Sequence, residues 1–198
     1  MQTNYDLKNQ EDTSKIKNKD IYIVPNKLEV IGLIASFILG FLLGFFLKNS
    51  WIMGIQGALF TTISCYMAMV DAKLHLVSDY FVLAIFGISL ITVIPALIDG
   101  YYMYCLWKLI AAIVLPIPLL IGTIVDKNGG IGGGDIKFVS AASFLLGVNK
   151  GIYGLILGLL VAIIIQLVII NIKKLDKKKT RFALIPYLAF SYVIFYFI

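Results

Sequence analysis

Long, nearly unbroken runs of apolar residues constrain this chain more than any other feature. A helix needs about 20 apolar residues to cross a bilayer, and the bilayer core forces such runs to satisfy their own backbone groups as helices. We therefore expect an all-α, polytopic membrane helix bundle of about six to seven transmembrane helices. The fifth run is short, and we expect it to be tilted, to meet a thinned membrane or to be only partly helical. The runs span residues 28–47, 51–70, 80–98, 102–123, 136–149, 151–172 and 182–198.

The composition supports a membrane protein and argues against several soluble classes. The chain is 60% hydrophobic and 14% charged, whereas soluble domains average roughly half apolar and a quarter charged. Its net charge of +6 comes from lysines between the runs, which fit membrane topology and contact with anionic lipids better than nucleic-acid binding. Cys65 and Cys105 lie inside apolar runs without a partner at metal-ligand spacing, so we expect neither a metal nor any other cofactor.

The lysines and arginines predict how the chain crosses the membrane. We expect residues 1–27, which are polar and mixed in charge, to form a disordered cytoplasmic tail, and residues 28–198 to form one membrane-embedded domain. A cytoplasmic N-terminus places 14 of the 17 lysines and arginines on the cytoplasmic side and leaves Lys48, Lys108 and Lys150 outside. Cytoplasmic segments of membrane proteins are enriched in these residues. If all seven runs cross, the C-terminus is outside.

Glycines and prolines predict how the helices pack. Pro116 and Pro118 lie late in the fourth run and should bend or unwind it near its cytoplasmic end. Small residues four positions apart let helices approach closely in lipid. Such pairs are Gly40 and Gly44, Gly147 and Gly151, and Gly154 and Gly158.

Two aspartates stand out because of their position. Asp71 follows the second run and Asp135 opens the fifth, so both are predicted at the cytoplasmic ends of helices, 64 residues apart in sequence. Carboxylates at the edge of the hydrocarbon are costly and are candidates for a functional site. Two neighbouring carboxyl groups share a proton, so one can activate a water while the other polarises a peptide carbonyl.

Structural roles compete with this interpretation. Asp135 could simply cap the fifth helix, and we weigh the two roles equally on this residue alone. Asp79, after Ser78 at the start of the third run, fits a helix cap better than a catalyst. Lys137 could serve topology alone or lower the pKa of an aspartate. His75 lies in a basic loop without a partner pattern, and we expect it to be solvated.

The glycine-rich stretch "NGGIGGGDIKF", residues 128–138, precedes the fifth run. It does not fit the G-x-G-x-x-G pattern of dinucleotide-binding loops, and it lacks the Gly-Lys-Ser/Thr ending of a phosphate-binding loop. Residues without a Cβ allow a substrate to approach the backbone closely, or allow positive φ angles. We therefore expect Gly132, Gly133 and Gly134 to support the aspartate pair.

These motifs resemble those of the type IV prepilin peptidases. "GGIGGGDIKF" is similar to that family's Gly-Gly-x-Gly-x-Gly-Asp-x-Lys element, which contains the GxGD motif of intramembrane-type aspartic proteases. The family's second element is an aspartate, five residues and Ile-Pro-Asp. Here Asp71 is followed by "AKLHL" and then by Val77, Ser78 and Asp79, so the spacing agrees and the Ile-Pro pair is replaced. "ALIPYLAF", residues 183–190, looks like the family's final helix with its proline.

The resemblance implies a function. Asp71 and Asp135 would be the catalytic pair of an endopeptidase in the plasma membrane that removes the basic leader of prepilins or prepilin-like proteins at the cytoplasmic face. Many members also methylate the new N-terminus and carry an insert with paired CxxC motifs. This chain has no CxxC, so we expect a compact, peptidase-only form. Presenilin-like proteases place the partner aspartate in a Tyr-Asp element, whereas Asp71 follows Val70.

A non-catalytic membrane protein is the alternative, either a proton- or cation-coupled transporter or an inactive peptidase homologue. Transport predicts broken spans and polar residues near the middle of the bilayer. The spans offer few polar residues apart from Thr61, Thr62, Ser64 and Gln166, and both aspartates lie at the interface. The residues therefore favour the peptidase.

Overall fold

The computed structural model describes residues 25–125, 132–173 and 183–198. In these ranges the chain is helical and has no strand, which confirms the all-α bundle. The predicted tail lies outside the described residues except for 25–27, and α2 already begins at Lys27, where the Asn26 N–H donates to the Glu29 carboxylate. The helices are α2 (Lys27–Lys48), α3 (Trp51–Leu74), α4 (Asp79–Ile98), α5 (Tyr102–Val114), α6 (Ile117–Val125), α7 (Gly133–Leu146), α8 (Val148–Lys173) and α9 (Ile185–Phe197).

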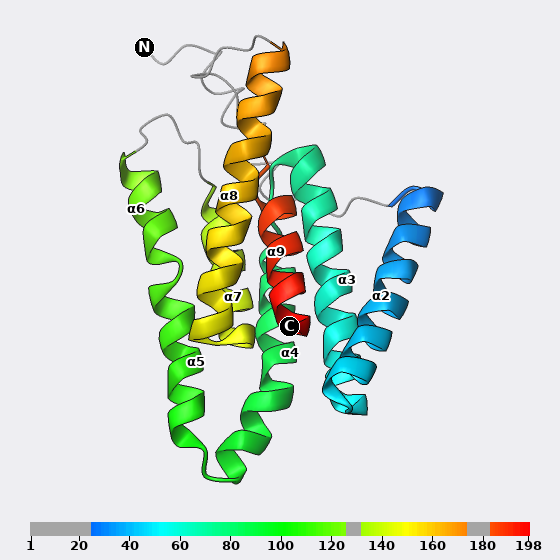
Figure 1. Cartoon of the computed structure of the whole chain (residues 1–198), viewed down its shortest axis with the longest axis vertical. Coiled ribbons are helices and arrows are strands. Elements are labelled where there is room, and N and C mark those ends of the chain that lie inside the picture. The colour runs from blue at the N-terminus through cyan, green and yellow to red at the C-terminus, as the bar shows by residue number, and fades with distance from the viewer. Residues whose placement is uncertain (1–24, 126–131, 174–182) are drawn as a thin grey trace, which may run out of the picture.

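Successive helices run alternately up and down the bundle, with α5 and α6 forming one rod (Figure 1). Five segments are long and apolar enough to cross a membrane: α2, α3, α4, the α5–α6 rod and α8. The remaining two are shorter, since α7 has 14 residues and α9 has 13. The predicted short fifth run is therefore a regular helix, and it starts three residues earlier than the apolar pattern indicated.

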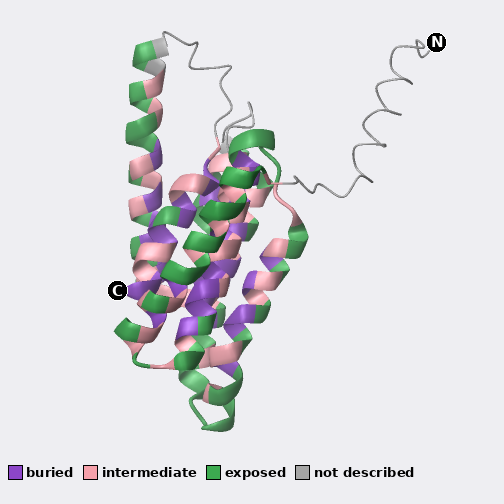
Figure 2. Ribbon diagram, turned by 90° about the vertical axis from the view of Figure 1, so that its right-hand side faces the viewer, coloured by how far each residue is buried: buried purple, intermediate pink, exposed green. Residues whose placement is uncertain are grey.

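The short helix α7 lies inside the bundle. Phe138, Val139, Ala141 and Ala142 of α7 are fully buried, and α7 contacts α4, α5, α8 and α9. Buried residues concentrate along the middle of the bundle, while the outer faces are exposed (Figure 2). Those exposed faces carry large apolar side chains, such as Ile163 of α8. Soluble proteins seldom expose contiguous apolar surface of this kind, so the outer faces suit contact with lipid.

Two of the three predicted glycine pairs mark close helix contacts. A Cβ on Gly44 would lie 2.6 Å from the Met53 carbonyl oxygen of α3, and one on Gly158 would lie 2.6 Å from Ser191 Oγ of α9. The pairing of Gly147 with Gly151 was wrong. Gly147 has a φ of +81° and forms the turn between α7 and α8, so these two glycines do not share one helix.

The proline break in the fourth run is confirmed. α5 ends at Val114 and α6 begins at Ile117, because a proline in a helix interior removes a backbone donor and clashes with the preceding turn. Leu115 and Leu119, on either side of the break, are buried. The break therefore redirects the rod without exposing its core face.

Candidate active site

The two aspartates predicted from the sequence meet at one end of the bundle, which we call the aspartate end. Asp71 lies in the last turn of α3, inside the helix and not after it as the apolar run indicated, and Asp135 is the third residue of α7. Both side chains line one cavity of about 280 Å³. They are nevertheless nearly buried, with exposed fractions of 5% and 6%. The cavity thus gives access to two carboxylates that the surrounding protein otherwise shields from water.

A backbone amide of α9 holds Asp71. The Ile185 N–H donates to Asp71 Oδ2 over 3.1 Å. Ile185 is the first residue of α9, and the first N–H groups of a helix have no partner within it, so this donor is available for a carboxylate. Its side chain is fully buried, which fixes the amide in place. The sequence indicated the α9 segment only as a motif with a proline. It did not predict this hydrogen bond, because residues of almost any type have a backbone N–H.

Asp135 accepts a hydrogen bond from its own helix start. The Gly132 N–H donates to Asp135 Oδ2 over 2.9 Å, so the capping role that we weighed against catalysis does exist. Capping occupies one oxygen and leaves Oδ1 for other chemistry. Burial, together with the smaller effect of the charge on Asp71, raises the pKa of Asp135 to about 7 against the lowering effect of the Gly132 hydrogen bond. Near neutral pH this carboxyl can therefore hold a proton.

The three glycines before Asp135 have different surroundings. A Cβ on Gly134 would lie only 2.2 Å from Val77 Cγ2, whereas one on Gly133 would meet nothing within 4 Å. Gly132 has a φ of −81°, so the expected positive φ angle is not the reason for glycine here. Gly134 instead lets the segment after α3 pack against the start of α7. The preceding residues, 128–131, lie outside the described parts of the chain.

Lys137 and Asp79 pair with one another. Lys137 Nζ lies 2.6 Å from Asp79 Oδ1, and both side chains are more than half exposed. The expectation that Asp79 caps α4 was wrong, because Ser78 occupies the cap position and no side chain makes the capping bond. Lys137 contacts neither Asp71 nor Asp135 through a hydrogen bond or ion pair among the described residues. Both Lys137 and Asp79 line the cavity without approaching the pair directly.

His75 lines the cavity, a position that the sequence did not predict. It ends α3 with a φ of +51° and donates its backbone N–H to the Asp71 carbonyl oxygen. Its side chain is exposed, as expected, but it lines the same cavity as the aspartates. Its spacing four residues after Asp71 is the signal that could have indicated this position. Among the described residues no group of three or more His, Cys, Asp or Glu side chains could hold a metal.

The sequence of this chain matches that of a known protein family. The sequence model of the type IV leader peptidase family matches residues 58–170, more than half of the chain. The chain belongs to this family. No curated protein and no solved structure matches this chain.

The matched region of this leader peptidase contains Asp71, Asp135 and the segment between them, but neither α2 nor α9. The Ile185 amide that holds Asp71 thus comes from outside it. Membership implies a peptidase that acts on prepilin-like substrates. Together with five long apolar helices it indicates a multi-pass membrane protein.

Proposed function

We propose that this leader peptidase is a membrane aspartic endopeptidase and that Asp71 and Asp135 are its catalytic pair. It removes the basic leader from type IV prepilins or prepilin-like proteins. The cleavage takes place at the cytoplasmic face of the plasma membrane, and the N-terminus of the enzyme is cytoplasmic. One observation carries the proposal: two nearly buried carboxylates from α3 and α7 line a single cavity.

The mechanism uses one proton shared by the pair. With Asp135 protonated and Asp71 ionised, Asp71 takes a proton from a water as the water oxygen attacks the peptide carbonyl carbon, and Asp135 donates a hydrogen bond to the carbonyl oxygen. The tetrahedral intermediate collapses when a proton passes to the leaving nitrogen and the C–N bond breaks. Water supplies the OH of the new carboxyl group and the H of the new amine, so the reaction requires no further reactant.

The surroundings suit this division of roles. Asp71 is held by the Ile185 amide, and hydrogen bonds to an ionised carboxylate stabilise its charge. Burial raises the pKa of both carboxyls, and that of Asp135 rises to about 7, which favours its protonated form. Gly132 and Gly133 are exposed beside the pair, so an extended leader can lie against backbone that carries no side chains.

Co-expression with a candidate prepilin, followed by gel analysis of leader removal, tests the proposal. Asp71→Asn and Asp135→Asn should each reduce cleavage at least about 100-fold, since general acid–base catalysis contributes that much or more. Both variants should still reach the membrane, which fractionation and immunoblotting can show. Normal cleavage by either variant would remove that residue from the catalytic pair.

Asp99→Asn is the matched control. Asp99 ends α4 at the opposite end of the bundle and is exposed, so the same chemical change there should leave cleavage at the wild-type level. Asp79→Asn should retain cleavage as well, because Asp79 pairs with Lys137 and not with the catalytic carboxylates. Loss of cleavage in the Asp99 variant would mean that the assay reports folding and not chemistry.

A further inference from the structure

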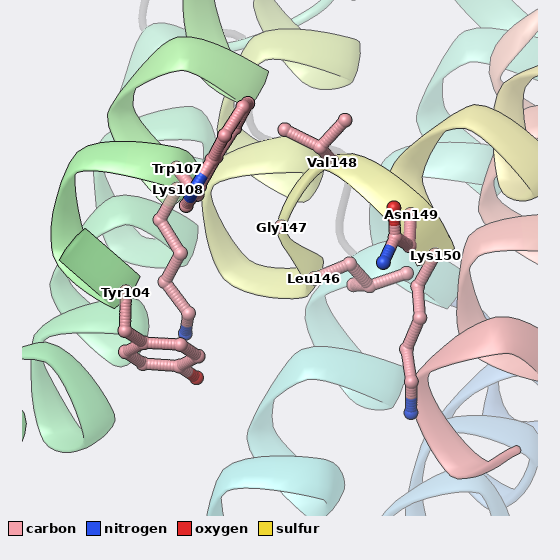
Figure 3. A pocket seen from close by; sticks show the side chains of 8 residues that line it. All are labelled: Tyr104, Trp107, Lys108, Leu146, Gly147, Val148, Asn149 and Lys150. Carbon is pink, nitrogen blue, oxygen red and sulfur yellow. The ribbon is translucent and has the colours of Figure 1, made fainter.

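A second polar region lies at the end of the bundle away from the aspartates. Lys48 ends α2, Lys108 lies in the second turn of α5 and Lys150 in the first turn of α8. They line two adjoining cavities of about 280 Å³ and 510 Å³, which share Lys108 and Lys150. Figure 3 shows Lys108 and Lys150 on either side of the turn between α7 and α8. We call this region the cationic cavity, lined by Lys48, Gln56, Thr92, Tyr104, Lys108 and Lys150.

Lys108 is the central residue of the cationic cavity. The distribution of lysines and arginines predicts that Lys108 lies on the outer side. In the structure it lies within a helix, and only 3% of it is exposed. Its ammonium donates to Thr92 Oγ1 and to the Leu145 carbonyl oxygen, each over 3.1 Å, and lies 4.9 Å from the centre of the Tyr104 ring. The two hydrogen bonds occupy two of its three protons, and all of these partners are uncharged.

The positive charge of the cavity has no counter-ion in the described parts of the chain. None of the three lysines forms an ion pair there, and neither cavity has an Asp or Glu in its lining. Lys48 and Lys150 also lie close enough to one another to interact electrostatically. Buried or half-buried like charges are costly without an opposite charge. The arrangement therefore favours an anion from outside the chain.

The remaining lining suits a ligand at the membrane interface. Gln56 and Thr92 add polar groups, and Asn149 adds an exposed amide beside Lys150. Trp107 borders the larger cavity and is 53% exposed, and tryptophan and tyrosine are enriched where membrane meets water. The cavity thus combines polar groups with the aromatic side chains typical of the membrane interface.

The cationic cavity is separate from the aspartate pair. Gln56 lines the cationic cavity and Asp71 the other, and both belong to α3. They are 15 positions apart in sequence, which corresponds to about 22 Å along a helix. A basic leader would also be repelled by three lysines, so the region does not extend the substrate site.

We propose that the cationic cavity binds a phosphate group of the kind carried by anionic phospholipid headgroups. The larger of its two adjoining cavities, of about 510 Å³, falls in the range of small-ligand sites, and basic pockets between transmembrane helices bind anionic headgroups in other membrane proteins. Lys48 and Lys150 contact the phosphate, while the buried Lys108 contributes positive charge from the wall of the cavity. The proposal does not depend on the peptidase activity.

Thermal unfolding of the full chain in detergent, with increasing amounts of added ligand, tests this site. The probes are phosphatidylglycerol, phosphatidylcholine and inorganic phosphate. Phosphatidylglycerol should raise the unfolding temperature saturably. Lys48→Gln/Lys150→Gln should bind it about thirtyfold more weakly, since each lysine near an anionic surface contributes about a factor of five. The matched control, Lys27→Gln/Lys73→Gln, removes two charges at the aspartate end and should bind like the wild type.

The outcomes separate the sources of the phosphate. Stabilisation by phosphatidylglycerol alone supports a lipid site, and equal stabilisation by inorganic phosphate supports a site for the free anion. Equal binding by the wild type and Lys48→Gln/Lys150→Gln would overturn the proposal, as would equal stabilisation by zwitterionic phosphatidylcholine. If the double variant does not fold, Lys150→Gln alone should bind phosphatidylglycerol about fivefold more weakly.

Discussion

The two ends of this bundle handle buried charge in opposite ways. At the aspartate end, Asp71 and Asp135 are each held by one backbone N–H and face a common cavity. At the other end, Lys108 is held by a hydroxyl, a carbonyl and an aromatic ring, and two more lysines lie around it. Each end holds nearly buried or partly buried ionisable groups of one kind, and two neighbouring carboxyls can relieve their repulsion by sharing a proton.

This difference separates chemistry from binding. A pair of carboxylates that shares one proton is already an acid and a base side by side, so the aspartate end is suited to move protons. The lysines are all donors and accept nothing, so their end is suited to hold an anion. Each end should therefore depend on the contacts that its buried charged groups make.

Gly134→Ala should have the largest effect among the variants that leave both carboxylates in place. The new Cβ would lie 2.2 Å from Val77 Cγ2, so the segment after α3 must move away from α7. Small displacements of catalytic groups can cost about 100-fold in rate, and we expect a loss of that order in leader removal. Gly133→Ala is the control, because its Cβ meets nothing within 4 Å.

The control also tests the role of the glycines in substrate binding. If Gly133→Ala cleaves at the wild-type rate, the glycines serve packing at position 134 more than substrate approach at position 133. If both variants lose activity equally while remaining folded, contact between the leader and the bare backbone is the stronger requirement. Leader removal at the wild-type rate by both Gly133→Ala and Gly134→Ala would contradict the packing role of Gly134.

The pH dependence of leader removal should show when Asp135 loses its proton. Its pKa is raised to about 7 by burial and by the neighbouring charge, and the proposed mechanism requires the protonated form. Activity should therefore fall as the pH rises through about 7, by about tenfold per unit above it. A rate measured between pH 5 and 9 that stays flat would contradict the assignment of the acid to Asp135.

The same raised pKa has a consequence for stability. A carboxyl whose pKa is higher in the folded than in the unfolded state favours folding at low pH, and this contribution is lost as the pH rises through the folded value. The free energy of unfolding should thus decrease between about pH 4, the usual value for aspartate, and about pH 7. In Asp135→Asn this part of the pH dependence should disappear, which denaturation in detergent can measure.

The sequence predicts more of the aspartate end of the bundle than of the end that holds the cationic cavity. Apolar runs and lysine placement predicted the helices and brought Asp71 and Asp135 to one side. The Ile185 amide was missed because any residue type supplies an N–H, and the contact between Gly134 and Val77 depends on the register of two helices. Lys108 was taken as a topology lysine, since sequence alone does not show which face of α5 meets Thr92 and Leu145.

Lys108→Met tests the other end of the comparison. The substitution keeps an unbranched side chain of similar length but leaves the Leu145 carbonyl without its donor, and an unsatisfied buried polar group costs about 1–3 kcal/mol. We expect a decrease of that size in the free energy of unfolding. Lys27→Met, at an exposed position, is the control and should change little. An unchanged stability in Lys108→Met would show that these contacts do not hold α5 against α7.

The smallest effect is expected for the Lys137–Asp79 pair. Because both side chains are more than half exposed, their coupling should be below about 1 kcal/mol, as a double-mutant cycle of Lys137→Gln and Asp79→Asn can measure by unfolding. Lys137→Gln should also leave the fall in activity near pH 7 in place, since this cation pairs with Asp79 and not with Asp135. A shift of that fall toward higher or lower pH would show that Lys137 acts on the catalytic pair. The catalytic pair would then be coupled to a cation, and the aspartate end would differ less from the cationic cavity.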